Sequence, residues 1–548
     1  MPIIRQNPNF ISILLNSCKS TTHLHQIHAQ IISRGLEQDH FLLTQFLCLS
    51  NNLCGLSYSS TVFDRILLPS TFLWNVLIKG YCEKSCFDDT ISVFVRMKRE
   101  EGVPDRYTYP SLIKVCAGEK RVREGRAIHG SAVRCGVELD LFVRTCLIDF
   151  YGKCMEIVCA RKVFDEMTER NVVSWTALVV GYVVAGDIVE AKRVFDEMPQ
   201  RNVASWNAMI RGFVKAGELG RARRIFDEMP KKNVVSFTTM IDGYAKAGDM
   251  GSARFLFDQA PDRDIVAWSA LISGYAQNGQ PREAVDMFFE MISRNVEPDE
   301  FILVSLMSAC SQEGSLKLAK WVDNYVVQSS IDLRRPHLRA AFVDMNAKCG
   351  NIERAASLFE QMPKPDVYSY CSMMQGFSIH GRGEQAVSLF NRMLNEGLIP
   401  DEVAFTVILT ACSRAGLVEE GWHFFESMKN KYCIVPSPDH YACMVDILSR
   451  SGRLRTAYEL LKSMPVEPLV SAWGTLLGAC KLHSDIELGK LVADRLFELE
   501  PQNAGTYVLL SNIYAAAGQW LDVSLVRKTM KERGINKIPG CSWISSQG

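Results

Sequence analysis

The 548-residue sequence lacks the features that mark several large classes of protein. Its 61 basic residues balance 61 acidic ones, so bulk charge does not indicate a nucleic-acid or anionic-membrane partner, although one face can still concentrate basic groups. The 18 cysteines are dispersed and form no CxxC pair, which favours reduced thiols over a disulfide framework. No apolar run has the length of a transmembrane helix. We therefore expect an ordered protein without membrane insertion.

What the sequence does contain is a repeat. The segment KRVFDEMPQRNVASW (192–206) recurs with small changes at 161–175, 223–237 and 254–268, each copy 31 residues after the last. A chain of this length is too long for one core. A fixed period indicates a solenoid of small units, each of which buries its apolar faces against its neighbours.

One period, 172–202, contains two amphipathic helical patterns. Apolar residues recur at helical spacing from Trp175 onward, and a second stripe follows after Gly186. Asp187 and Glu190 have the spacing of a capping box at the start of the second helix, and Pro199 ends it. Each repeat is therefore predicted to be a helix, a turn and a helix.

The pattern predicts fourteen repeats of about 31 to 36 residues. Their expected starts are residues 8, 40, 71, 106, 141, 172, 203, 234, 265, 300, 336, 367, 402 and 438. Residues 1–7 precede the array. The chain has Arg5 and Lys19 but no acidic residue before Glu37, which fits part of an organellar transit peptide or an ordinary first helix.

Several conspicuous residues have structural explanations. The recurring tryptophans Trp175, Trp206 and Trp268 lie on the apolar stripe, as expected of core residues. Cysteines late in the first helices are likewise expected in the core; they are Cys116, Cys310, Cys412 and, as a weaker match, Cys18.

Some residues could suggest a metal site or acid–base catalysis. His23, His25 and His28 invite a metal, but no cysteines cluster nearby; Cys82 and Cys86 lack a second pair. The Asp196–Glu197 pair recurs in several repeats opposite the apolar stripe, which favours a solvated face over acid–base catalysis. We predict no catalytic residues, no metal site and no cofactor.

Repeats with VxSWNAMIxGFxKxG and VFDEMPxRN cores resemble those of pentatricopeptide repeat (PPR) proteins, and the alternating lengths resemble the plant PLS subclass. The resemblance implies an all-α fold, a right-handed α-solenoid of about fourteen helix-turn-helix repeats over 8–468, plus two degenerate repeats. Those two, over 469–537, resemble the family's E domain, and 538–548, with PGCSWI, resembles the start of an E+ extension. The zinc signature of the family's DYW deaminase, HxE followed by PCxxC, is absent. The resemblance thus implies an E-subgroup protein that is not an enzyme.

In this family one repeat binds one RNA base. The fifth and last residues of a repeat contact the Watson–Crick edge, and the second residue packs against base faces. The implied base-reading pairs are Asn75 with Asp105 for uridine, Thr145 with Asn171 and Thr176 with Asn202 for adenine, Asn207 with Asn233 for a pyrimidine (cytidine favoured), and Thr238 with Asp264 and Ser269 with Asp299 for guanine. The implied base-sandwiching residues are Val173, Val235 and Val266.

The implied RNA site is U-n-A-A-C/U-G-G, 5′ to 3′, where n belongs to the repeat at 106, with Pro110 and Asp140. The chemistry agrees with these assignments, because an ionised Asp only accepts and so favours a base edge with N–H donors. Fifth residues further on offer no such code; they are Val304, Ala340, Cys371 and Ala442. Recognition should therefore be strongest over 141–299. Asn, Thr and Asp are also ordinary helix-start residues, which is the competing explanation.

The resemblance implies an organellar site-recognition factor for C-to-U RNA editing. Its partners would be single-stranded organellar RNA, a DYW-type deaminase recruited in trans and accessory organellar editing factors. The expected compartment is the mitochondrion, with the chloroplast as the alternative. Two other functions stay open: an organellar RNA stabilisation, splicing or translation factor without an editing role, and a protein scaffold.

Overall fold

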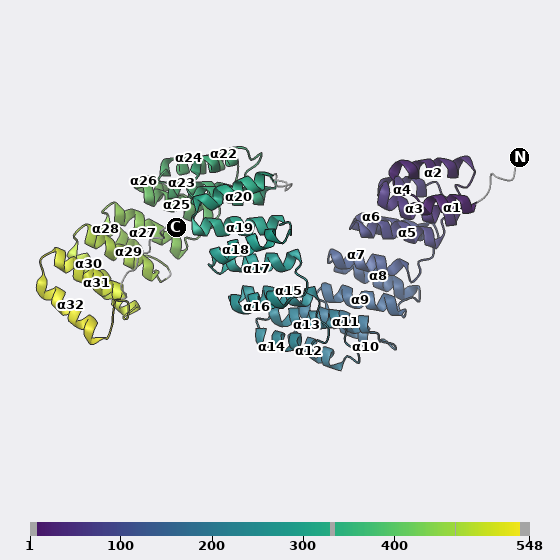
Figure 1. Cartoon of the computed structure of the whole chain (residues 1–548), viewed down its shortest axis with the longest axis horizontal. Helices are drawn as coiled ribbons and strands as arrows, with labels where there is room; N and C mark the ends of the chain where they lie inside the picture. The colour runs from purple at the N-terminus through teal and green to yellow at the C-terminus, as the bar shows by residue number, and fades with distance from the viewer. Residues whose placement is uncertain (1–7, 329–334, 466, 538–548) are drawn as a thin grey trace. The chain divides into compact units, whose positions relative to one another are not determined.

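The structure, a computed structural model, describes residues 8–328, 335–465 and 467–537. Within these ranges all regular secondary structure is α-helical, in 32 helices (Figure 1). The expected segments 1–7 and 538–548 lie outside the described residues. The chain divides into two compact parts, Met1–Ala267 and Trp268–Gly548, which we call the N-terminal body and the C-terminal body.

The helices of the N-terminal body are α1 (Pro8–Asn16), α2 (Thr21–Ser33), α3 (His40–Leu53), α4 (Leu56–Phe63), α5 (Thr71–Glu83), α6 (Phe87–Arg99), α7 (Thr108–Gly118), α8 (Val122–Arg134), α9 (Leu141–Lys153), α10 (Ile157–Asp165), α11 (Val172–Ala185), α12 (Ile188–Glu197), α13 (Val203–Lys215), α14 (Leu219–Glu228), α15 (Val234–Lys246) and α16 (Met250–Gln259). The boundary between the bodies falls within α17 (Ile265–Gln277).

The remaining helices are α18 (Pro281–Ser293), α19 (Glu300–Glu313), α20 (Leu316–Gln328), α21 (Pro336–Lys348), α22 (Ile352–Glu360), α23 (Val367–Ile379), α24 (Gly383–Asn395), α25 (Glu402–Ala415), α26 (Val418–Asn430), α27 (Pro438–Arg450), α28 (Leu454–Lys462), α29 (Val470–Leu482), α30 (Ile486–Leu499), α31 (Ala504–Ala516) and α32 (Trp520–Glu532).

Each repeat contributes an odd-numbered first helix and an even-numbered second helix. In the N-terminal body α9 packs against α7 and α11 on either side and against its own second helix, α10. In the C-terminal body α21 packs in the same way against α19, α23 and α22. Within each body the first helices thus form one layer and the second helices another, which confirms the expected all-α solenoid.

The first helices begin where the sequence predicts in thirteen of the fourteen repeats. The exception is α7, which begins at Thr108 and not at residue 106. Pro110 has no N–H, so it cannot donate the hydrogen bond to the carbonyl of residue 106 that a helix starting there would need. The chain instead enters the helix through a tight turn in which the Thr108 N–H donates to the Asp105 carbonyl at 3.0 Å. The repeat register is unchanged.

The recurring segment of the sequence is the joint between consecutive repeats. The Arg201 guanidinium donates from Nε to the Phe195 carbonyl at 3.0 Å, near the end of α12, and lies 4.7 Å from the centre of the Phe195 ring. That ring meets Trp206 of the next repeat edge to face, with centroids 4.9 Å apart. Asn202 caps α13. The recurring segment therefore contains the end of one helix, the cap of the next helix and the side chains that pack the two together.

Most residues expected in the core lie there. Trp206, Trp268 and the four late-helix cysteines are buried, and Trp175 is half-buried beside Phe164. The cysteines of the described residues are all free thiols. The helices α29–α32 continue the hairpin packing, because Leu476, Val492 and Leu510 share one buried cluster. Within the described ranges no helix is long and apolar enough to cross a membrane.

Candidate nucleic-acid interface

The last residue of a repeat is the N-cap of the next first helix in several repeats, although the N-cap of α7 is Tyr107. Asn202 caps α13 by accepting the Ser205 N–H on Oδ1 at 2.8 Å, and Asn233 caps α15 by accepting the Ser236 N–H at 3.0 Å. The fifth residue lies one turn inside the preceding first helix. Because consecutive first helices pack side by side, this residue and the following N-cap become neighbours.

In four of the six predicted base-reading pairs the polar side-chain atoms lie within hydrogen-bond distance of each other. Asn75 Nδ2 donates to Asp105 Oδ1 at 3.0 Å, and Asn207 Nδ2 donates to Asn233 Oδ1 at 3.1 Å. The hydroxyls of the threonine pairs approach their partners less closely: Thr176 to Asn202 at 3.3 Å and Thr238 to Asp264 at 3.4 Å. The repeat register taken from the sequence thus brings these side chains together.

The other two pairs are not joined by a hydrogen bond among the residues that the structure describes. The Thr145 hydroxyl donates to the Leu141 carbonyl at 2.7 Å, and its partner Asn171 caps α11. Asp299 caps α19 by accepting the Ile302 N–H at 2.9 Å, and Ser269 makes no bond to it. These four residues keep their places at the fifth and last positions of their repeats.

Capping fixes what each last residue presents to a ligand. The Oδ1 atoms of Asn202 and Asn233 are occupied by backbone N–H groups, and their Nδ2 atoms have no hydrogen-bond partner in the described part of the chain. Asp105 lies in the turn before α7, where its Oδ1 atom accepts the Tyr107 and Thr108 N–H groups, and its Oδ2 atom has no hydrogen-bond partner in the described part of the chain. A last-position Asn therefore presents a donor, and a last-position Asp presents an acceptor.

The second residues of the repeats form a row of exposed apolar side chains. The three predicted ones, Val173, Val235 and Val266, are 45–57% exposed. Sequence reasoning missed three more, Phe72, Tyr107 and Phe142, which are 62–64% exposed. The repeat register could have found them, since each is the second residue of its repeat. Exposed aromatic rings of this kind are the side chains on which unpaired bases stack.

A hollow of about 810 Å³ crosses the first helices α3, α5, α7, α9 and α11; we call it the N-terminal groove. The three aromatic second residues line it together with the fifth residues Asn75, Thr145 and Thr176. Lys79, Lys114 and Lys153 also line it, and Lys153 is paired with Asp149 at 2.7 Å. A chain of zero net charge thus gathers basic groups beside its base-reading positions, which suits a phosphate backbone.

In the C-terminal body four of the fifth positions carry neither a hydroxyl nor an amide, whereas Ser269 and Thr406 keep a hydroxyl. Ala340 and Cys371 are buried, and Val304 and Ala442 are partly buried. Burial raises the pKa of the Cys371 thiol to about 12, with Asp401 and Asp366 adding to the effect, so the thiol stays neutral at physiological pH. These positions offer at most a weak S–H donor to a base edge.

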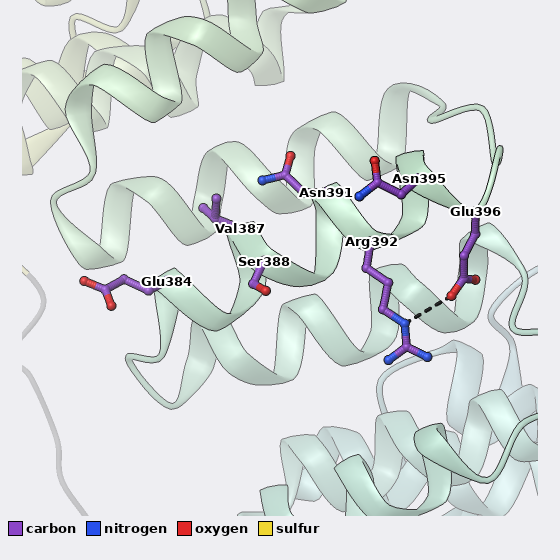
Figure 2. A pocket seen from close by; sticks show the side chains of 7 residues that line it. All are labelled: Glu384, Val387, Ser388, Asn391, Arg392, Asn395 and Glu396. Atoms are coloured by element: carbon purple, nitrogen blue, oxygen red, sulfur yellow. Dashed lines mark hydrogen bonds and ion pairs between the residues drawn. The ribbon is translucent and has the colours of Figure 1, made fainter.

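A second hollow, of about 620 Å³, lies along α24 in the C-terminal body (Figure 2). All of its lining side chains come from this one helix and its C-cap, Glu396. Arg392 donates from Nε to Glu396 Oε1 at 3.1 Å and also pairs with Glu360 at 2.7 Å. The helix is the second of its repeat, so this hollow contains no base-reading position.

Four of the residues that could suggest metal or acid–base chemistry, two histidines and two carboxylates, have structural partners. His28 Nδ1 lies 2.7 Å from the Tyr58 hydroxyl, and burial lowers the pKa of His28. His25 lies 3.5 Å from the Cys54 sulfur. Asp196 pairs with Lys192, and Glu197 pairs with Arg193 at 3.3 Å. The described residues contain no cluster of three potential metal ligands.

Comparison with known families matches the repeats and the C-terminal segment. The PPR repeat model matches 142–172, 173–203, 204–234, 235–265, 341–366, 403–433 and 439–468, and the PPR repeat family model matches 69–118, 263–312 and 365–414. The E motif model matches 483–545, starting inside the segment expected from residue 469.

Individual proteins match along nearly the whole chain. The pentatricopeptide repeat-containing protein At5g37570 of Arabidopsis thaliana is 60% identical over 543 residues, covering 98% of this chain and 99% of that protein. The protein At1g06140, mitochondrial, of the same plant is 35% identical over 545 residues, covering 96% and 97%. The crystal structure of PPR10 in complex with an 18-nt psaJ RNA element has a similar fold, with a TM-score of 0.54 at 16% identity, covering 97% of this chain and 87% of that one.

Proposed function

Because the chain belongs to the pentatricopeptide repeat family, we propose that it binds a short single-stranded organellar RNA sequence and marks a cytidine for C-to-U editing. We further propose that it belongs to the PLS subclass. The single observation that carries RNA recognition is the set of four fifth-and-last residue pairs whose polar atoms lie within 3.0–3.4 Å of each other, with the fifth residues in register on α5, α11, α13 and α15.

Each pair meets a base edge in a defined way. A base that inserts between two successive second residues, such as Phe142 and Val173, is held by its faces. Its Watson–Crick edge then points at the pair. The donor amide of Asn202 or Asn233 suits the ring-nitrogen acceptor of adenine or cytosine, whereas the acceptor carboxylate of Asp105 suits the ring N–H of uracil or guanine. The geometry of the caps thus supports the assigned bases.

The editing role rests on the E motif, which matches 483–545. This segment carries no deaminase zinc signature, so we propose that a DYW-type deaminase acts in trans, with accessory organellar editing factors. The last described helix, α32, exposes Trp520, Leu521 and Leu525, and exposed apolar side chains of this kind are common at protein contacts. The protein itself would contribute recognition and not catalysis.

We propose the mitochondrion as the compartment, with the chloroplast as the alternative. A relative covering almost the whole chain bears the mitochondrial designation in its name. The N-terminal residues Arg5 and Lys19, with no acidic residue before Glu37, are also compatible with an organellar transit peptide.

The decisive experiment is deep sequencing of chloroplast and mitochondrial RNA from a null mutant and the wild type. It should score C-to-U conversion, splice junctions and transcript ends together. We expect one or a few cytidines to lose editing, each preceded by a sequence like UnAA(C/U)GG. Intact editing with an altered intron or transcript end would instead assign the protein to RNA stabilisation, splicing or translation. No change in any of the three would favour a protein scaffold.

A further inference from the structure

The third residue of a following repeat contacts two of the base-reading amides. The Thr108 hydroxyl, at the start of α7, donates to Asn75 Oδ1 at 2.7 Å. The Ser236 hydroxyl, at the start of α15, donates to Asn207 Oδ1, also at 2.7 Å. Thr108 and Ser236 are 0% exposed, so neither can touch RNA directly. Their hydroxyls contact the base-reading residues Asn75 and Asn207 from the buried side.

The equivalent serines in two other repeats make a different bond. The Ser174 hydroxyl donates to the Asn171 carbonyl at 2.9 Å, and the Ser205 hydroxyl donates to the Asn202 carbonyl at 2.8 Å. Their preceding fifth residues are threonines, whose own hydroxyls donate to carbonyls one turn back. The third-residue hydroxyl thus turns to the fifth residue where that residue is Asn, which has a side-chain carbonyl to accept it.

A hydroxyl has a single proton, and the surrounding atoms decide where it goes. Asn233 Oδ1 lies 2.8 Å from the Ser236 hydroxyl oxygen, but it already accepts the Ser236 N–H and the Asn207 amide. Asn207 Oδ1 receives no other donor among the described residues. The Ser236 proton therefore serves Asn207, while the hydroxyl oxygen accepts the Asn233 N–H at 3.2 Å.

We propose that Thr108 and Ser236 are positioning residues for base recognition, each the third member of a reading site with a fifth-position Asn. This inference rests on the proposed RNA-binding function. Each amide is held at both ends: Nδ2 donates to the last residue, and Oδ1 accepts from the buried hydroxyl. One N–H and one lone pair remain to meet the base in a fixed orientation. Without the hydroxyl only one bond holds the amide, and it can rotate away from the base edge.

The test compares two variants, each of which loses the serine hydroxyl at the third position of its repeat. Ser236→Ala removes the contact with Asn207, whereas Ser205→Ala, the matched control, removes only capping bonds. Binding of the full-length chain would be measured with four synthetic RNAs of sequence UnAANGG that differ at N, the nucleotide assigned to Asn207. For Ser236→Ala we expect the preference for pyrimidines at N to fall by a factor of about two to ten, the equivalent of one hydrogen bond.

Two further variants separate the possible failures. Ser236→Thr should restore the preference, since threonine stands at the equivalent position 108. If Asn207→Ala abolishes the preference while Ser236→Ala keeps it, the positioning role is wrong and RNA recognition stands. If Asn207→Ala itself has no effect, the proposed recognition by this repeat is wrong. An equal loss of preference in Ser205→Ala would show a general effect of capping and would also overturn the inference.

Discussion

The two bodies of the molecule use the same helix caps but place different residues beside them. In the N-terminal body the capping Asn202 and Asn233 lie next to the polar side chains of Thr176 and Asn207. In the C-terminal body Asp366 and Asp401 cap α23 and α25 in the same way, accepting backbone N–H groups at 2.9 and 2.8 Å. The fifth residues paired with these two caps are the buried Ala340 and Cys371.

The comparison shows that an acidic or amide cap at the end of a repeat does not by itself indicate base recognition. Capping satisfies a backbone N–H at a helix start and stabilises the helix wherever it occurs. The cap becomes half of a reading pair only where a polar fifth residue lies beside it. Recognition should therefore be strongest from Asn75 to Ser269 and weak at the repeats with Ala340 and Cys371, and the variants below test that difference from the largest expected effect to the smallest.

Exchanging two fifth residues should have the largest effect. The double variant Asn207→Thr and Thr238→Asn exchanges the side chains beside Asn233 and Asp264. Affinity for UnAACGG should fall by about 2–6 kcal/mol, because two base contacts worth ~1–3 kcal/mol each are lost. Binding should recover on UnAAAUG, since Thr with Asn implies adenine and Asn with Asp implies uridine. Fluorescence anisotropy with both RNAs measures the exchange.

The matched control for this exchange is Ala340→Cys with Cys371→Ala in the C-terminal body. Neither residue has a hydroxyl or amide for a base edge, so affinity should stay unchanged on every RNA. A large loss in this control would extend base recognition to the repeats that start at 336 and 367. No loss in the Asn207 and Thr238 exchange would favour a protein scaffold over an RNA reader.

Most of this architecture can be predicted from the sequence because the repeat period gives the position of each helix. The 31-residue period, the helix-breaking glycines and the Asn or Asp caps place the first helices, and only α7 begins later, owing to the local effect of Pro110. The same register brings Asn75 to Asp105 and Asn207 to Asn233. These contacts follow from spacing alone, since the last residue of one repeat must begin the next helix.

Other features depend on three-dimensional choices that spacing does not encode. Ser236 and Ser205 both stand three residues after a capping Asn, yet the Ser236 hydroxyl bonds a neighbouring side chain and the Ser205 hydroxyl a backbone carbonyl. The acceptor of the serine hydroxyl depends on the fifth residue of the preceding repeat, which lies across the helix–helix contact. The exposed aromatic residues Phe72, Tyr107 and Phe142 could have been identified from the sequence, since each is the second residue of its repeat.

Removing one aromatic second residue should have the next largest effect. Phe142→Ala should weaken RNA binding by about 1–3 kcal/mol, because a base loses its stacking surface. Tyr368→Ala is the matched control: its ring is also exposed at a second position, but the fifth residue of its repeat is Cys371. It should cost little affinity. Both rings are mainly exposed, so thermal unfolding followed by circular dichroism should change little in either variant. Equal losses of affinity would indicate stacking along both bodies.

Removing a cap separates helix stability from recognition. Asn202→Ala and Asp366→Ala should each destabilise the start of one helix by about 0.5–2 kcal/mol, because a backbone N–H loses its acceptor. Hydrogen exchange at the first turns of α13 and α23 measures this loss, which is local in a solenoid. Only Asn202→Ala should also weaken binding of an RNA with adenine at the nucleotide assigned to Thr176. Weaker RNA binding by Asp366→Ala would contradict the assignment of a purely structural role to the cap Asp366.

The smallest expected effect is a gain. Cys371→Thr places a hydroxyl at a fifth position beside the cap Asp401, and Cys371 is about as buried as the reading residue Thr176, at 6% and 9% exposure. A Thr with Asp implies guanine, so RNAs with guanine at the third nucleotide after UnAA(C/U)GG should bind more tightly by about 0.5–1.5 kcal/mol. Cys371→Val, which has the same shape without the hydroxyl, should show no such preference. If Cys371→Thr also shows no preference for guanine, the identity of the fifth residue does not by itself explain why this repeat recognises no base. The shape of the surface around it must then contribute.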